Sequence, residues 1–134
     1  MNGSKFSFPG KHILLVEDNL STQELMVDMI GAIDCTLDIA NNGEEAIAKW
    51  LNNDYDLVIM DLQMPVMDGY QTTMEIRKLE NRTKKHTLIL AITASAMSTD
   101  RNKCFKSGMD DYLTKPINID MFEKKLAALF SRKP

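Results

Sequence analysis

This 134-residue sequence has few cysteines and no excess of basic residues. Its two cysteines, Cys35 and Cys104, lie far apart and outside any CxxC or Cys/His spacing. A disulfide or a zinc site is therefore not expected, and both thiols are interpreted as small buried apolar groups in a reducing compartment. The net charge of −3 offers no broad basic surface for a nucleic-acid backbone. These features predict a cytoplasmic protein without direct nucleic-acid contact.

Long apolar runs are also missing. The runs at 13–16, 57–60 and 88–92 are far shorter than the roughly 20 residues that a membrane helix needs. The first ten residues lack a basic region followed by an apolar core, so they do not resemble a secretory signal. We expect no membrane contact by this domain. The hydrophobic content of 44% is enough for one compact domain of this length.

Short apolar runs alternate with amphipathic segments along the chain. Runs rich in branched residues predict strands at 12–16, 35–40, 56–60, 87–93 and 111–114. Helix signals between and after these strands predict five helices. The first begins at Ser21 with Gly31 near its end, the second starts at 42–45, and the third covers 70–79. The fourth starts at 98–100 and ends at Gly108, and the fifth is capped by Asn118. The predicted apolar stripes are Leu25, Met26, Met29, Ile30 and Ile33, then Ala46, Ile47, Trp50 and Leu51, and finally Phe122, Leu126, Leu129 and Phe130.

Five strands that alternate with five helices imply a parallel sheet, because each right-handed crossover uses a helix to return the chain to the same edge. The predicted fold is a doubly wound α/β domain with a five-stranded parallel sheet. In such sheets, ligands bind beyond the carboxyl ends of the strands, near the switch in strand order.

Polar side chains stand at these predicted strand ends. Glu17 and Asp18 follow the first strand, Asp61 the third, Thr93 ends the fourth, and Lys115 follows the fifth. Three converging carboxylates repel one another unless a hard cation such as Mg²⁺ or Mn²⁺ neutralises them. A lysine and a hydroxyl beside them could hold the oxygens of a phosphoryl group. Taken singly, each residue is more often a cap, turn or loop residue; the joint placement favours a site.

The segments that carry these residues closely resemble response-regulator receiver domains. They are Val16-Glu17-Asp18-Asn19, Met60-Asp61-Leu62-Gln63-Met64-Pro65-Val66-Met67-Asp68-Gly69, Ile92-Thr93-Ala94 and Gly108-Met109-Asp110-Asp111-Tyr112-Leu113-Thr114-Lys115-Pro116. The resemblance implies a flavodoxin-like receiver fold over 11–131, with 1–10 as an N-terminal extension or linker and 132–134 as a tail.

The resemblance also implies a role for each matching residue. Asp61 would be the phosphorylated nucleophile, with Glu17, Asp18, Asp61 and the carbonyl of Gln63 at the metal. Lys115 and Thr93 would contact the phosphoryl group, and Thr93 and Tyr112 would act as the switch. Gln63 and Ser95 would tune hydrolysis, and the bond before Pro116 would be cis.

The implied function is phosphorelay signalling. Asp61 would take the phosphoryl group from a histidine kinase or histidine phosphotransfer protein, and the face of the fourth helix and fifth strand would respond. Two origins stay open: a receiver attached to a hybrid sensor kinase, which the motifs favour, or a stand-alone response regulator. The domain would be a monomer or weak homodimer. Whether it counts as an enzyme also stays open, since it would promote its own phosphorylation and dephosphorylation.

Three other classes compete with this interpretation. A haloacid dehalogenase-type phosphohydrolase also forms an aspartyl phosphate, but it needs an Asp where this chain has Gln63. A flavodoxin-like redox carrier needs a phosphate-binding loop rich in Ser, Thr and Gly, whereas the loop here is Glu17-Asp18-Asn19. A degenerate receiver that only binds partners would not need all of the chemical positions filled.

Overall fold

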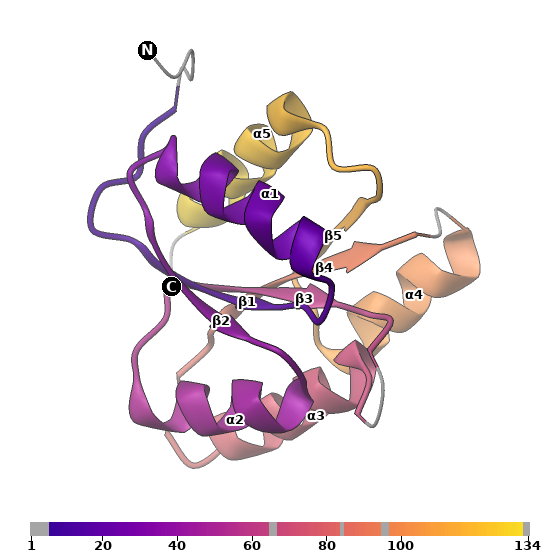
Figure 1. Ribbon diagram of the computed structural model, residues 1–134. Coiled ribbons are helices and arrows are strands. Elements are labelled where there is room, and N and C mark those ends of the chain that lie inside the picture. Colours follow the sequence, from indigo (N-terminus) through magenta and orange to yellow (C-terminus); the bar gives the residue numbers. More distant parts are fainter. Residues whose placement is uncertain (1–5, 65–66, 84, 95–96, 133–134) are drawn as a thin grey trace.

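The computed structural model describes residues 6–64, 67–83, 85–94 and 97–132 (Figure 1). Along them, five strands alternate with five helices. In chain order these are β1 His12–Val16, α1 Leu20–Gly31, β2 Thr36–Ala40, α2 Gly43–Asn52, β3 Leu57–Asp61, α3 Gly69–Glu80, β4 Leu88–Thr93, α4 Ser98–Ser107, β5 Asp111–Thr114 and α5 Ile119–Phe130. The predicted elements are all present, with most boundaries within a residue or two.

The strands form one parallel sheet in the order β2-β1-β3-β4-β5, which confirms the predicted doubly wound fold. The strand order reverses between β1 and β3, so the carboxyl ends of these two strands flank the switch point. Asp61 is the last residue of β3 and pairs with Ile92 of β4. The sequence pattern predicts that this strand ends at residue 60, with Asp61 after it. That boundary was wrong because the ladder to β4 continues through Asp61, and Leu62 N still donates to Ile92 O at 3.1 Å.

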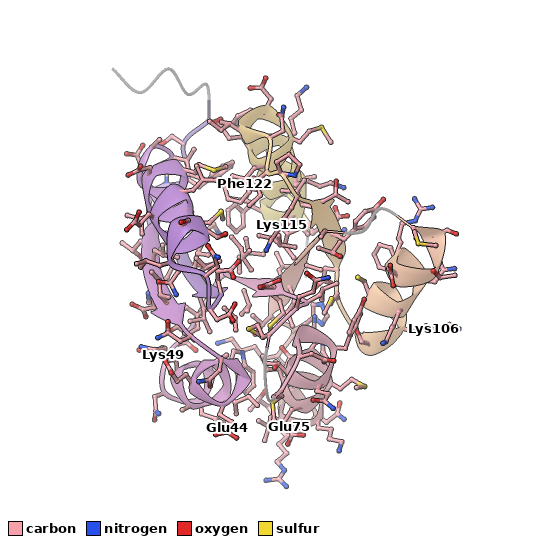
Figure 2. The ribbon with its side chains drawn as sticks, turned by 45° about the vertical axis from the view of Figure 1, so that its right-hand side comes forward. Glu44, Lys49, Glu75, Lys106, Lys115 and Phe122 are labelled. Carbon is pink, nitrogen blue, oxygen red and sulfur yellow. The ribbon has the colours of Figure 1, made fainter. Side chains whose placement is uncertain are left out.

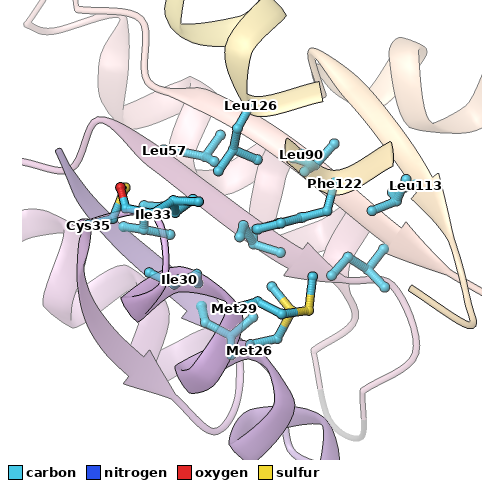
Figure 3. Close-up of a cluster of buried hydrophobic side chains, with 14 of the residues drawn as sticks. Met26, Met29, Ile30, Ile33, Cys35, Leu57, Leu90, Leu113, Phe122 and Leu126 are labelled. Carbon is cyan, nitrogen blue, oxygen red and sulfur yellow. The ribbon is translucent and has the colours of Figure 1, made fainter. Parts of the chain in front are cut away.

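Helices cover both faces of the sheet. In Figure 1, α1 and α5 lie on one face and α2 and α3 on the other, with α4 toward the β5 edge. Alternate strand residues enter two cores, because successive side chains point to opposite faces. Ile13 and Leu15 join the core under α1 and α5, while Leu14 and Val16 join the opposite core. Phe122 of α5 is fully buried and packs among Met26, Met29 and Leu126 (Figure 3).

Two residues of the predicted apolar stripes point to solvent. Leu25 of α1 is 43% exposed and Leu51 of α2 is 59% exposed. In α1, the core-facing positions run from Gln23 through Met26, Met29 and Ile30, and all four are buried. Leu25 keeps helical spacing with Met29 but lies at the outer edge of the stripe that Gln23, Met26 and Ile30 define, so this part of the prediction was wrong.

Polar side chains cap the first turns of α1, α2, α3 and α5 at the carboxyl edge of the sheet, with Asn42 as the cap of α2. The side chains of Asn19, Asp68 and Asn118 accept hydrogen bonds from the backbone N–H groups of the first turns of α1, α3 and α5. Each such cap stabilises a helix by about 1 kcal/mol. At the end of α4, Gly108 has a φ of 108°, a left-handed conformation that glycine adopts without strain, as predicted.

A half-buried arginine ties α3 to the α4–β5 turn. Arg77 donates from Nε to the carbonyl of Gly108 at 2.9 Å and from Nη2 to Asp110 at 2.9 Å. Its Nη1 donates to Glu80 at 2.6 Å and to the carbonyl of Thr87 at 2.8 Å. Asp110 also accepts from the Ile89 N–H at 2.8 Å. This arginine therefore fixes the turn that leads into β5.

Both cysteines are buried and carry free thiols, as expected. Among the helices that the structure describes, none is both long enough and apolar enough to cross a membrane.

Candidate functional site

Three carboxylates meet at the carboxyl edge of the sheet. Glu17 and Asp18 directly follow β1, and Asp61 ends the neighbouring strand β3. One oxygen of each lies within 4.8 Å of the others, which brings the predicted acidic residues together. Glu17 and Asp61 are buried, whereas Asp18 is exposed. The cluster is therefore open to solvent on one side and supported by the sheet on the other.

Lys115 supplies the positive charge of the cluster. Its Nζ lies 3.5 Å from Oε1 of Glu17 and 3.7 Å from Oδ1 of Asp61. The Lys115 backbone N–H donates to the carbonyl of Thr93 at 2.7 Å, and the bond from Lys115 to Pro116 is cis. In Figure 2, Lys115 points toward the interior, whereas Glu44, Glu75 and Lys106 lie on the outer surface.

Burial dominates the electrostatics of Glu17. Desolvation, followed by the neighbouring Asp61 carboxyl group, raises the pKa of Glu17 from 4.5 to about 7. Its Oε2 accepts a hydrogen bond from the Asn19 N–H at 3.1 Å. Among the described residues, its buried Oε1 has no hydrogen-bond partner. A buried oxygen of this kind, beside two further carboxylates, fits a hard divalent cation that prefers oxygen ligands.

The segment after β3 folds back over Asp61. The N–H of the exposed Gln63 donates to Oδ1 of Asp61 at 3.1 Å. At Gly69, a Cβ atom would lie 2.6 Å from the Asp61 carbonyl oxygen and 3.0 Å from Cα of Leu62. Only glycine allows the start of α3 to lie this close to β3.

The two expected switch residues lie on neighbouring strands. Thr93 is buried at the end of β4, one residue beyond the partner of Asp61, and it pairs with Thr114 of β5. Tyr112 is half-buried on β5, and its ring lies edge-on to Phe105 of α4 with centroids 6.3 Å apart. The Tyr112 hydroxyl accepts a hydrogen bond from Arg101 at 3.3 Å.

Ser95, expected to tune hydrolysis, lies outside the described residues.

The sequence interpretation missed one buried polar residue at this edge. Gln23 of α1 is 8% exposed, and its Nε2 donates to the Glu17 carbonyl at 2.6 Å and to Oδ1 of Asn41 at 2.9 Å. An available signal was the position of a glutamine three residues before Met26, on the core-facing side of the helix.

Comparisons with known proteins agree with this arrangement. The family model described as response regulator receiver domain matches residues 13–127. Hybrid signal transduction histidine kinase G of Dictyostelium discoideum is 49% identical over 109 residues, which is 80% of this chain and 3% of the kinase. Response regulator mcs4 of Schizosaccharomyces pombe is 31% identical, covering 88% of this chain and 27% of that protein. The chain thus spans a small part of these relatives.

Solved structures share the fold. The receiver domain of the Pseudomonas aeruginosa sensor histidine kinase PA1611, which has a magnesium ion coordinated in its active-site cleft, has a TM-score of 0.82 and 35% identity, covering 92% of this chain and 99% of that domain. The Saccharomyces cerevisiae Ssk1 receiver, crystallised with the histidine phosphotransfer protein Ypd1, has a TM-score of 0.82 and 34% identity, covering 90% of this chain and 88% of that one. With the acidic cluster at the strand ends, these matches show that the chain belongs to the response regulator receiver domain family, which serves phosphorelay signalling in response regulators and hybrid histidine kinases.

Proposed function

We propose that Asp61 accepts a phosphoryl group from a phosphohistidine, with Lys115 and Thr93 in contact with the transferred group. The observation that carries the proposal is the position of Lys115 Nζ, 3.7 Å from the Asp61 carboxylate and 3.5 Å from Glu17. A lysine placed beside a buried aspartate can offset the negative charge of an incoming phosphoryl group.

In the proposed transfer, an Asp61 carboxylate oxygen attacks phosphorus in line with the departing imidazole. The new O–P bond forms as the P–N bond breaks, and the imidazole nitrogen keeps the electron pair. Lys115 holds charge on the phosphoryl oxygens, and the Thr93 hydroxyl donates a hydrogen bond to one of them. Water later hydrolyses the acyl phosphate, at a rate that Gln63 and Ser95 modulate.

The residues that would hold a divalent cation are Glu17, Asp18, Asp61 and the carbonyl of Gln63. The support in this chain is the buried Oε1 of Glu17, which faces Lys115 Nζ at 3.5 Å but has no hydrogen-bond partner among the described residues, and the approach of three carboxylate oxygens to within 4.8 Å. When bound, Mg²⁺ or Mn²⁺ neutralises the charge that develops on the transferred group. Asp18, which is exposed, would be the ligand that also faces solvent.

The proposed phosphoryl donor is a histidine kinase or a histidine phosphotransfer protein. Support comes from the relatives and from three exposed apolar residues placed just after the carboxyl ends of strands. Leu20 begins α1 and is 67% exposed, Met97 precedes α4 and is 66% exposed, and Ile119 begins α5 and is 55% exposed. Apolar side chains around a polar site are typical of a protein interface.

We further propose that the chain is the receiver segment of a hybrid sensor kinase. The 49% identity to a hybrid histidine kinase supports this origin over a stand-alone regulator.

Phosphorylation adds about 1 to 2 negative charges to a site that already holds three carboxylates. Thr93 and Tyr112 would respond first, and the contacts of Tyr112 with Arg101 and Phe105 would pass the change to α4.

Intact-protein mass spectrometry tests the proposal. The native chain, incubated with acetyl phosphate and Mg²⁺, should gain one labile phosphoryl group. Asp61→Asn and a chelated sample of the native chain should gain none. Absence of the gain in the native chain would leave a receiver fold that only binds partners, and rapid turnover of added phosphate esters would instead favour a phosphohydrolase.

A further inference from the structure

Gln23 links three segments at the carboxyl edge of the sheet. Its backbone N–H donates to the carbonyl of Asn19 at 3.0 Å as part of the first turn of α1. Its side-chain amide donates to the carbonyl of Glu17, in the acidic loop after β1, and to Asn41, in the loop after β2. One side chain therefore connects the acidic loop to the helix behind it and to the neighbouring loop.

These contacts complete the hydrogen bonding of the Glu17 backbone. The Glu17 N–H donates to the Ala40 carbonyl at 3.0 Å, and the Glu17 carbonyl accepts from Gln23 at 2.6 Å. The peptide group is planar, so the Glu17 carbonyl and the Asp18 N–H lie in one rigid plane. The hydrogen bond from Gln23 thus fixes the plane from which Asp18 projects.

The burial of an amide here is itself informative. Gln23 occupies the core-facing side of α1, in line with Met26, Met29 and Ile30. An apolar side chain would pack there without desolvation of a polar group, which is unfavourable unless hydrogen bonds replace the lost water. The Gln23 amide is therefore retained here for its hydrogen bonds to two acceptors. One of them, the Glu17 carbonyl, belongs to the peptide group between two proposed metal ligands, Glu17 and Asp18.

We propose that Gln23 is a positioning residue of the cation site, because it holds the Glu17–Asp18 peptide so that both carboxylates stay directed toward Asp61. This inference rests on the proposed role of Glu17, Asp18 and Asp61 in cation binding. It assigns Gln23 no contact with the cation or with the phosphoryl group.

The test measures Mg²⁺ binding by calorimetry and metal-free stability by urea unfolding. Trp50 is the single tryptophan, and its Nε1 donates to Thr87 at 2.9 Å, so its fluorescence reports unfolding from outside the acidic cluster. Gln23→Met keeps the length and removes both side-chain donors. Ile30→Val, in the fully buried part of the same helix, is the control that weakens the core without touching the acidic loop.

For Gln23→Met, we expect the Mg²⁺ Kd to rise by about tenfold or more, as for other residues that orient metal ligands. Ile30→Val should lower the urea midpoint and leave the Kd unchanged. Unchanged Mg²⁺ affinity in Gln23→Met, with normal binding by the native chain, would overturn this inference alone. A native chain that binds no Mg²⁺ would overturn the proposed metal role and this inference with it.

If Gln23→Met does not fold, Asn41→Ala decides the question. This variant removes the second acceptor of Gln23. The Gln23 amide then keeps its hydrogen bond to the Glu17 carbonyl but is no longer held in place by Asn41. A weaker Mg²⁺ affinity would support the inference, and an affinity equal to that of the native chain would overturn it.

Discussion

Lys115 reaches from the β5–α5 connection to Asp61 at the end of β3, and its Nζ stops 3.7 Å from Oδ1. The same nitrogen lies 3.5 Å from Glu17, so one partly exposed cation faces two buried carboxylates. A cation in this position opposes the binding of a metal ion but favours the arrival of a phosphoryl group. The two effects can be separated by experiment.

Lys115→Met should slow phosphorylation by acetyl phosphate by on the order of 10²-fold, because a donor to the developing charge is lost. Mg²⁺ affinity should stay the same or increase, since a competing positive charge is removed. Phosphorylation rates and calorimetry measure the two quantities. Lys106→Met, on the outer surface of α4, is the matched control and should change neither. Equal losses of metal affinity and rate in Lys115→Met would contradict this prediction.

Glu17 predicts a pH dependence of the metal-free protein. Its pKa is raised from 4.5 to about 7 in the folded state, so folding favours the protonated form. The contribution of Glu17 to the free energy of unfolding is fully present below pH 4.5 and is lost as the pH rises through 7. The rise corresponds to roughly 3 kcal/mol for this fully buried side chain. Relative to Glu17→Gln, the native chain should therefore lose stability from pH 5 to pH 8.

Urea unfolding at several pH values, with and without Mg²⁺, measures this difference. Mg²⁺ should restore more stability to the native chain than to Glu17→Gln at pH 8, because the ionised carboxylate then has a partner. A difference between the two proteins that stays constant across the pH range would show that Glu17 is not responsible.

Gly69→Ala should destabilise the fold by about 1–3 kcal/mol, because the new Cβ would lie 2.6 Å from the Asp61 carbonyl oxygen. Gly31→Ala is the control, since a Cβ there meets nothing within 4 Å, and it should cause no loss of stability. Urea unfolding followed through Trp50 compares them. Equal stability of the two variants would mean that the start of α3 can move away from β3 freely.

Leu20→Glu should impair transfer from a phosphorylated histidine phosphotransfer protein and leave labelling by acetyl phosphate intact. The reason is that Leu20 is 67% exposed beside the acidic loop and would meet a docked protein but not a small donor. Leu51→Glu, with a similar exposure of 59% on α2, is the control and should affect neither reaction. If Leu20→Glu slowed phosphorylation by acetyl phosphate as much as transfer from the phosphotransfer protein, the substitution would impair the phosphorylation reaction at Asp61 and not the docking of the partner.

Much of the fold follows from local patterns in the sequence. The five strands are short apolar runs with abrupt polar ends, and side chains at these ends meet because parallel strands end at one edge. This explains why Glu17, Asp18, Asp61 and Lys115 could be placed together from sequence. The gathering of these four side chains at one edge confirms that part of the interpretation, and their chemical roles remain predictions.

The residues that the sequence analysis misplaced or missed have physical reasons in common with other folded proteins. Leu25 and Leu51 were placed in the apolar stripes because they recur at helical spacing, but both lie at the outer edge of their stripe and are exposed. Gln23 was overlooked because a polar residue in a helix is ordinarily exposed, and its partners lie in two loops that only the folded chain brings together. Asp110 was quoted only as part of a motif. Its contacts with Arg77 and the Ile89 N–H depend on tertiary structure that no local pattern contains.

The contacts of Arg77 limit how pieces of this protein can be exchanged. A chimera that imports α4 and β5 from a relative would bring a new residue at position 110 but retain Arg77 from the host. Unless the imported segment supplies a carboxylate there, the guanidinium keeps Glu80 of its own helix but loses the Asp110 carboxylate in a largely buried site. The α4–β5 segment is therefore not an independent module, and residue 77 of α3 has to be chosen together with it.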